Sequence, residues 1–315
     1  MKFTITFRSK SLLITATLIL GLSIQAMAAA GNHRTNKTNE SYYSISKIPE
    51  VLFNRKPKQH DAAYAISPDA VLYKLKQKQK ITLIDVRNPE EFERMRIPGS
   101  LNIPLYAVKT KVFLKSFAVV LINEGVNYSP LETECRHLTD LGFKAFVLDG
   151  GLPAWKRKGN RLAGDLFALE EMRVISPQVF FQEKDYENTL VVDISPVQTE
   201  ASRKLMPYSK HLPVSADPRE WARNVDQIIT SHKNQPFLSI LVFNEAGDGY
   251  TSVYKILANA AANAFCLQGG VAGYNRYLGD LMLSWRPRNI RIKTNRKCGT
   301  CAKEIEKNII TEIRR

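Results

Sequence analysis

Cysteine is scarce in this chain, and what is missing around its few cysteines excludes several kinds of protein. Only Cys135, Cys266, Cys298 and Cys301 occur in 315 residues. No cysteine stands near the N-terminal apolar segment, which argues against a lipid anchor on cysteine, and no histidine follows Cys301, which excludes c-type haem attachment. Beyond the N-terminal segment, no stretch resembles a membrane span. A wholly disordered chain is also excluded, because 44% of the residues are apolar and 24% are charged.

The N-terminal segment, residues 1–30, has the pattern of a signal peptide. Basic residues, the last of them Lys10, precede an uncharged stretch that ends in a small-x-small motif at Ala26-Met27-Ala28. We therefore expect cleavage and a periplasmic or secreted protein. The alternative is an uncleaved inner-membrane anchor, since the apolar stretch is nearly long enough to span a bilayer.

The positive net charge of +15 is concentrated at the ends of the chain. From Arg286 to Arg315 ten basic residues stand against three acidic ones. Such a basic tail would suit an anionic surface, and the alternative is a solvated, flexible end. No nucleic-acid partner is expected, because no aromatic residue interleaves with the bases after Asn289 and the protein is predicted to be exported.

An internal repeat organises the rest of the sequence. AISPDAVLYKL (65–75) returns as VISPQVFFQEK (174–184), and two apolar runs, ITLIDV and TLVVDI, each contain an aspartate, Asp85 and Asp193. The copies close with VLDGGLPAW (147–155) and CLQGGVAGY (266–274). The offset grows from 109 residues at Ser67 and Ser176 to 119 at Gly150 and Gly269, so the second copy carries about ten extra residues.

Within each copy, short apolar runs alternate with helical stretches. Ser67-Pro68 and Ser176-Pro177 indicate a helix N-cap followed by proline in the first turn. Continuous apolar strands separated by helices predict an α/β fold with a central, mostly parallel sheet and helices on both faces. The expected layout is a flexible lead-in (31–61), a first domain (62–165), a second domain (171–285) joined to it through about 160–172, and a basic tail (286–315).

The motifs of the first copy resemble those of rhodanese domains. They are Asp85-Val86-Arg87, Glu91-Phe92, Ile97-Pro98-Gly99-Ser100, Asn102-Ile103-Pro104 and the closing run from Leu141 to Trp155. The resemblance covers about 62–160, and through the repeat it extends to a more diverged second copy at 171–285. It implies two rhodanese-like domains in tandem, similar in layout to thiosulfate or mercaptopyruvate sulfurtransferases.

In that family, activity depends on a cysteine at the end of the central strand, where backbone N–H groups and a helix start stabilise its thiolate or persulfide. At the matching positions this sequence has Asn123 and Asn244. An amide can neither ionise nor carry a sulfane sulfur, so the family's covalent mechanism cannot run through either loop. Cys135, in a helical pattern, and Cys266, in a strand pattern, are expected to be small buried apolar groups rather than substitute nucleophiles.

The loops also differ from the family in charge. Neither contains Arg or Lys, and their carboxylates would repel an anionic sulfur donor. The loop is either remade for another ligand, such as a cation or a basic peptide, or decayed into surface charge. The candidate loop residues are Asn123, Glu124, Gly125, Val126, Asn127, Tyr128 and Ser129 in the first copy, and Asn244, Glu245, Ala246, Gly247, Asp248, Gly249 and Tyr250 in the second, which is two residues longer before the matching serine Ser252.

The tail carries the other chemical candidate, a C-x-x-C pair made by Cys298 and Cys301. Neighbouring bases such as Lys297 favour thiolates, which would suit a redox or sulfur-relay dithiol. The surrounding run faintly resembles the opening of a heavy-metal-associated domain, which would suit a soft metal ion. The simplest alternative is a small disulfide in an oxidising compartment.

The sequence leaves three candidate functions. The first is a catalytically degenerate tandem rhodanese that acts as a binding or scaffold module. The second is a sulfurtransferase or persulfide carrier that uses Cys298 and Cys301, and the third is soft-metal handling through the same pair. No cofactor is indicated, and the expected partner is an unknown protein or a small anionic or sulfur-containing ligand.

Overall fold

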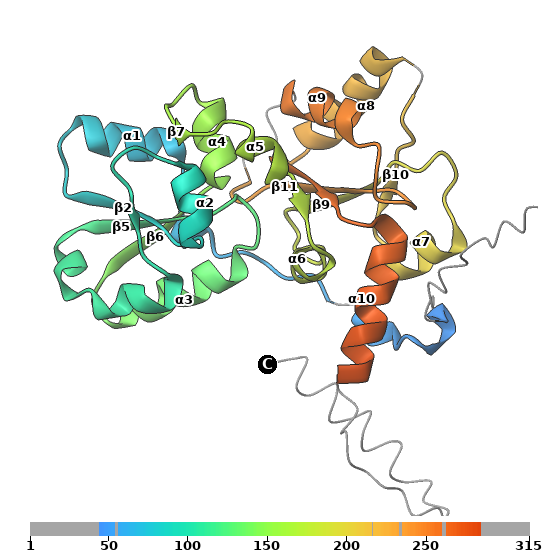
Figure 1. The fold of residues 1–315 in the computed structure, drawn as a ribbon, viewed down its shortest axis with the longest axis horizontal. Coiled ribbons are helices and arrows are strands. Elements are labelled where there is room, and N and C mark those ends of the chain that lie inside the picture. The colour runs from blue at the N-terminus through green and yellow to red at the C-terminus, as the bar shows by residue number, and fades with distance from the viewer. Residues whose placement is uncertain (1–43, 54–55, 216, 233–234, 260–262, 285–315) are drawn as a thin grey trace, which may run out of the picture. The chain divides into compact units, whose positions relative to one another are not determined.

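Two five-stranded sheets form the framework of the protein in the computed structural model, which describes residues 44–53, 56–215, 217–232, 235–259 and 263–284 (Figure 1). The predicted signal peptide and the tail with Cys298 and Cys301 lie outside these residues. In the first sheet the strand order is β1-β6-β5-β2-β4, and in the second it is β8-β12-β11-β9-β10. All neighbouring strands within both sheets are parallel. The two orders correspond strand for strand.

The strands lie where the apolar runs predict them. The first sheet consists of β1 (Ala65–Ile66), β2 (Ile81–Asp85), β4 (Leu101–Asn102), β5 (Ala118–Ile122) and β6 (Lys144–Leu148). The second consists of β8 (Val174–Ile175), β9 (Thr189–Asp193), β10 (Lys210–His211), β11 (Ser239–Phe243) and β12 (Asn263–Leu267). Every residue of β9 and β11 is buried, which explains why these strands read as continuous apolar runs.

Helices cover both faces of the first sheet (Figure 1). On one face α3 (Ser129–Asp140) packs Leu131 and Cys135 against Val119 and Leu121. The opposite face carries α1 (Pro68–Lys76) and α4 (Gly151–Arg157), which pack on the alternate residues of β5. A further short helix, α2 (Pro89–Arg94), follows β2. Neighbouring residues of β5 therefore serve two separate apolar cores, one on each face.

The second sheet is covered in the same way. One face carries α6 (Pro177–Glu183), α7 (Glu200–Leu205) and α10 (Gly270–Ser284), and the other carries α8 (Pro218–Thr230) and α9 (Thr251–Asn259). Trp221 of α8 and Tyr274 of α10 are fully or almost fully buried on opposite faces. The α/β fold class predicted from the sequence is confirmed.

The two serine-proline signals begin helices as predicted. The Ser67 hydroxyl accepts a hydrogen bond from the Ala70 amide at 3.2 Å, and the Ser176 hydroxyl accepts one from the Val179 amide at 3.3 Å. In both helices proline occupies the first turn, where its missing N–H has no helical partner to lose.

The expectation of a flexible lead-in is wrong for residues 44–53. This segment forms two short 3-10 helices, η1 (Ile45–Lys47) and η2 (Glu50–Leu52), followed by η3 (Ala62–Tyr64). Ile48, Leu52 and Phe53 are buried in the core that also holds Phe180 and Tyr274 of the second half. Helices of three residues are too short to give a periodic pattern, so the sequence indicated only a polar leader.

The connection between the halves is also structured. Strand β7 (Ala163–Gly164) pairs antiparallel with β3 (Met95–Arg96), and α5 (Ala168–Glu171) places Ala168 in the core of the first sheet. Two more 3-10 helices, η4 (Leu105–Thr110) and η5 (Val112–Ser116), lead into β5. Residues 160–171 thus pack against the first half, and the exact domain limits stay a prediction.

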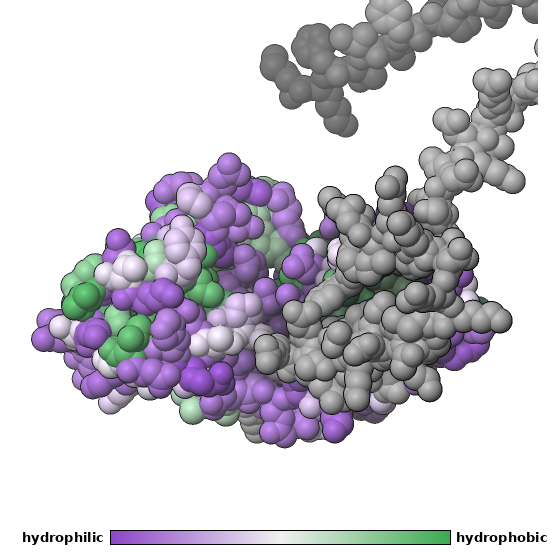
Figure 2. Space-filling view, turned by 90° about the horizontal axis from the view of Figure 1, so that it is seen from below, coloured by the Kyte–Doolittle hydropathy of each residue, from purple (hydrophilic) through white to green (hydrophobic). Residues whose placement is uncertain are grey.

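The surface of the described residues is mostly hydrophilic on the face shown in Figure 2, where apolar side chains form small, separate patches. Among the residues with a defined placement, no helix has the length and apolar character needed to cross a membrane.

Candidate functional site

The first candidate loop follows β5 and is held together by the side chain of Asn123. Its amide oxygen accepts a hydrogen bond from the Gly125 N–H at 2.9 Å, and its amide nitrogen donates to the Val126 carbonyl at 2.6 Å. Asn123 is only 4% exposed. The amide thus fills the centre of the loop and satisfies one donor and one acceptor of its backbone.

Asn244 does the same in the second half. Its amide oxygen accepts from the Gly247 N–H at 2.6 Å, and its amide nitrogen donates to the Asp248 carbonyl at 2.8 Å. The carbonyls of Asn123 and Asn244 also accept matching bonds from Leu152 and Val271, at 3.2 and 3.0 Å. The asparagines therefore have one structural role, performed twice.

Each loop lies directly against the glycine pair that follows β6 or β12. A side-chain carbon on Gly125 would lie 2.4 Å from the Gly150 carbonyl oxygen, and one on Gly247 would lie 2.1 Å from the Gly270 nitrogen. Both residues also have positive φ, +89° and +78°. Only glycine fits at these positions, for lack of space and because of its backbone conformation.

A buried tyrosine ends each loop. The Tyr128 hydroxyl donates to the Gly125 carbonyl at 2.7 Å, and the Tyr250 hydroxyl donates to the Leu267 carbonyl at 3.0 Å. The next residue begins α3 or α9, so these tyrosines are structurally equivalent. The second loop is therefore one residue longer before the helix, not two, because the sequence comparison matched Ser129 with Ser252 rather than with Thr251.

The exposure of the two asparagines predicts unequal effects of removing them. Asn123→Ala leaves a buried donor and a buried acceptor without partners, so we expect a loss of about 2 kcal/mol in the free energy of unfolding. Asn244→Ala leaves partly solvated groups, so we expect about 1 kcal/mol or less. Urea unfolding of both variants checks this, and a larger loss for Asn244→Ala would contradict the assigned roles.

The two cysteines in the described region are buried, as predicted. Cys135 lies in α3 and Cys266 in β12, both fully buried and unpaired. Burial raises the pKa of each thiol to about 12. A thiol that stays protonated at neutral pH is a poor nucleophile, so neither substitutes for a loop cysteine.

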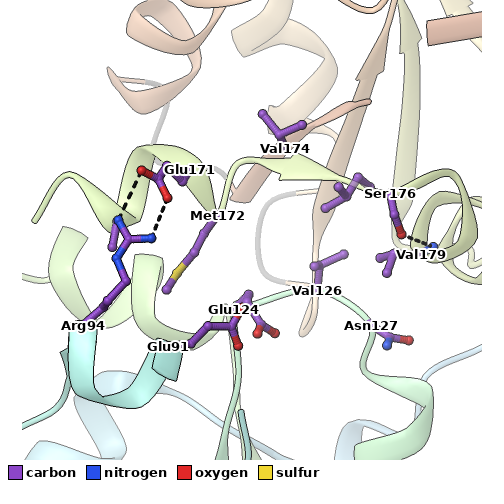
Figure 3. A pocket seen from close by; sticks show the side chains of 12 residues that line it. Glu91, Arg94, Glu124, Val126, Asn127, Glu171, Met172, Val174, Ser176 and Val179 are labelled. Carbon is purple, nitrogen blue, oxygen red and sulfur yellow. Dashed lines mark hydrogen bonds and ion pairs between the residues drawn. The ribbon is translucent and has the colours of Figure 1, made fainter. Parts of the chain in front are cut away.

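A cleft of about 490 Å³ opens beside the first loop (Figure 3). Glu124, Val126 and Asn127 contribute its loop side, and α2 contributes Glu91 and Arg94. The remaining wall comes from α5 and the start of the second half: Ala168, Glu171, Met172, Val174, Ile175, Ser176 and Val179. Its volume lies in the range of small-ligand sites.

Charge in the cleft is predominantly negative. The Arg94 guanidinium is already neutralised, since it donates to the two Glu171 carboxylate oxygens at 2.6 and 3.1 Å. Glu91 and Glu124 make no side-chain hydrogen bond or ion pair with another described residue. Burial, helped by the nearby charges of Glu91 and Asp85, raises the pKa of Glu124 to about 7, although its own backbone amide and Arg87 oppose the shift.

The predicted site residues divide between structural and cleft-lining positions. Glu124, Val126 and Asn127 line the cleft, whereas the other predicted residues of the first loop hold or end it. In the second loop, Glu245 accepts a hydrogen bond from the Thr199 hydroxyl at 3.0 Å. The candidate thiols Cys298 and Cys301 lie outside the described residues. Within the described part of the chain, no group of three or more His, Cys, Asp or Glu is placed to hold a metal ion.

Glu91, Arg94 and the wall from Ala168 to Val179 were not predicted as site residues. Glu91 follows β2 by six residues, and the carboxyl ends of neighbouring parallel strands meet at one edge of a sheet. That rule would have placed Glu91 near the loop after β5. The rest of the wall lies in the connection between the halves, where no sequence pattern indicates a site.

The topology and the strand-end loop define an α/β domain with a central parallel sheet and a candidate site at the carboxyl end of its middle strand. Residues 69–158 match the family model of the Rhodanese-like domain. The chain therefore contains one rhodanese-like domain in its first half, which relates it to the sulfurtransferase family. No curated protein matches the chain.

Several solved structures are similar in part. A rhodanese-related protein from Thermoplasma volcanium is 22% identical, with 32% of this chain and 98% of that protein covered and a TM-score of 0.28. A rhodanese-like domain from Anabaena is 21% identical, with 33% and 81% covered and a TM-score of 0.29. A thiosulfate sulfurtransferase from Pseudomonas aeruginosa is 16% identical, with 68% of this chain but only 42% of that protein covered and a TM-score of 0.29. Likenesses at this level carry no information about activity.

Proposed function

We propose that this chain is an exported tandem rhodanese-like protein that does not transfer sulfur through its strand-end loops and acts as a binding or scaffold module. The observation that carries the proposal is the side chain of Asn123, buried in the loop and bonded to the Gly125 N–H and the Val126 carbonyl. It takes up a backbone donor that would otherwise be available to a bound anion.

The repeated details support a second rhodanese-like domain. Strands β2 and β9 each end in an aspartate whose carboxylate accepts a hydrogen bond from the backbone amide two residues further on. The Arg87 amide donates to Asp85 at 3.1 Å, and the Ser195 amide donates to Asp193 at 3.0 Å. The same asparagine contacts and the same close approach of glycines follow in both halves. A shared order of strands and shared loop contacts are what a duplication would leave.

The loops offer no nucleophile for sulfur transfer. A covalent mechanism needs a side chain that can attack the donor and leave again, and a primary amide does neither. The carboxylates beside the first loop, Glu91 and Glu124, are also unfavourable to an anionic donor such as thiosulfate. The basic tail would add contact with an anionic surface, and the signal-peptide pattern supports export to the periplasm or medium.

The first test is an assay of sulfur transfer from thiosulfate to cyanide, with a known thiosulfate sulfurtransferase as the positive control. We expect the purified chain from residue 31 onward to form no thiocyanate above the rate of buffer alone. Activity that Cys298→Ser or Cys301→Ser abolishes would overturn the proposal in favour of a sulfurtransferase or persulfide carrier. Stoichiometric copper(I) binding lost in the same variants would instead support soft-metal handling.

A further inference from the structure

We propose that the cleft beside the first loop binds an alkylammonium group, with Glu91 and Glu124 holding the cationic head and the apolar wall receiving its carbon chain. This inference rests on the proposed binding role, because it names the class of ligand for that function. Either a free amine or a lysine side chain carries such an alkylammonium group.

Two carboxylates without partners face the cleft. Glu124 comes from the loop after β5 and Glu91 from α2, and Figure 3 shows both side chains at the same end of the cleft. Neither side chain makes an ion pair or a hydrogen bond with another described residue. The largely buried Glu124 carboxylate has lost water and gained only its own backbone amide as a donor, and a cation supplies the charge partner that it lacks.

The other charges around the cleft are already paired. Arg94 is held by Glu171 at 2.6 Å and lies 3.6 Å from Asp165. Behind the loop, Arg87 is bonded to Asp85 at 2.6 Å in a buried ion pair. Glu91 and Glu124 therefore give the cleft its net charge, so an anionic ligand is repelled and a cationic one is attracted.

The wall opposite the loop is mostly apolar. Met172, Val174, Ile175 and Val179 line it, and Val126 adds an apolar side chain from the loop. Figure 3 shows Met172, Val174 and Val179 around the space beside Glu124. A short carbon chain buried there gains about 0.8 kcal/mol for each methylene removed from water. A charged head with an apolar arm fits this combination of walls better than a hydrated metal ion, which offers nothing to the apolar side.

Binding of a cation is expected to depend on pH. The raised pKa of Glu124, about 7, means that this carboxyl is partly protonated at neutral pH. A cation binds the ionised form, so affinity rises as the pH increases through 7 and binding releases up to one proton. The ionisable groups around Glu124 are Glu91, Arg87 and Asp85, together with the Arg94–Glu171 pair across the cleft.

The test is calorimetric titration of the whole chain from residue 31 with hexylammonium chloride, with 1-hexanol as the neutral analogue. We expect hexylammonium to bind more tightly at pH 8 than at pH 6, and 1-hexanol to bind at least tenfold more weakly, as expected for one charged hydrogen bond. Glu124→Gln should weaken hexylammonium binding by about ten- to hundredfold and remove most of its pH dependence. Equal binding of the alcohol, or unchanged binding by Glu124→Gln, would overturn the proposal.

Glu90→Gln is the matched control. Glu90 precedes Glu91 on α2 but is exposed and does not line the cleft, so this variant should bind as the unaltered chain does. Titration with N-acetyl-lysine methylamide then tells the two sources apart: binding of this probe supports a lysine side chain, and binding of hexylammonium alone supports a free amine. If the protein forms thiocyanate and also binds the cation, only the proposed function is overturned. If it forms no thiocyanate and does not bind the cation, only this inference is overturned.

Discussion

Replacing His60 with alanine is expected to lower the free energy of unfolding by about 3–5 kcal/mol near pH 6, because it leaves two buried carboxylates without their shared cation. The imidazole Nδ1 lies 2.6 Å from a Glu132 oxygen on α3, and Nε2 lies 3.7 Å from a Glu183 oxygen on α6. The three side chains are 2%, 8% and 0% exposed. One histidine in the lead-in therefore joins a helix of each half.

Aromatic contacts fix the position of the ring. The His60 ring stacks on Tyr186, with ring centroids 3.7 Å apart and an interplanar angle of 3°. It also makes edge-type contacts with Tyr128 and Phe237, at centroid distances of 5.6 and 5.4 Å. Alanine would remove this packing together with the ion pairs. Since Tyr128 also ends the first candidate loop, loss of His60 should loosen the loop as well.

The effect of His60 on stability should fall as the pH rises. Burial lowers the pKa of His60, but hydrogen bonds and charges from Glu132 and Glu183 outweigh it and raise the pKa above the ordinary histidine value. A group whose folded-state pKa is raised contributes stability that is complete below its unfolded pKa and is lost as the pH passes its folded pKa. The difference between the two proteins in urea unfolding should thus be largest near pH 6 and smaller near pH 9.

Two further variants test the assignment. His137→Ala removes a histidine from the surface of α3, where its side chain is 46% exposed, and should change stability by less than about 0.5 kcal/mol. Glu183→Gln should stabilise the His60→Ala protein, because it removes one of the charges left unpaired. A pH-independent loss, or no rescue by Glu183→Gln, would mean that packing rather than charge explains the role of His60.

The sequence predicted the parts of the fold that local patterns determine. Apolar runs located the central strands, the serine-proline pairs located the starts of α1 and α6, and the repeat predicted that both loops follow equivalent strands. Asn123 and Asn244 were placed at strand ends because each follows four apolar residues. These features depend on neighbours in the chain, so the chain alone shows them.

Features that depend on distant contacts were not predicted. His60 and Glu132 are 72 positions apart, and nothing in a polar lead-in indicates that one of its residues will be buried against two helices. The cleft has the same origin, since Glu91, Glu124 and Met172 come from three elements whose approach depends on how α5 packs back onto the first sheet. A single sequence shows which side chains are present but not which distant ones lie close together in the fold.

Substituting Glu124 with glutamine is expected to stabilise the protein at alkaline pH, by about 3 kcal/mol at pH 8.5. The pKa of this carboxyl is raised to about 7, chiefly by burial. An acid with a raised folded-state pKa is more easily ionised in the unfolded chain, so stability falls as the pH rises from about 4.5 to about 7 and stays lower above that range. Glutamine has the same shape and no charge to bury, so it avoids this loss.

The pH dependence separates this explanation from a simple gain in packing. At pH 4 the carboxyl is mostly protonated in the folded and unfolded chains alike, so Glu124→Gln and the unaltered protein should then unfold at nearly the same urea concentration. At pH 8.5 the melting temperature of the variant should be several degrees higher, because each kcal/mol of added stability raises it by about 2–4 °C. Glu90→Gln, on the exposed face of α2, should show no such change.

Equal stability of Glu124→Gln and the unaltered protein at both pH values would mean that Glu124 is better solvated than its place in the cleft implies. A variant that is more stable yet no longer binds hexylammonium would show that this carboxylate is kept at a cost to folding because of the ligand it holds.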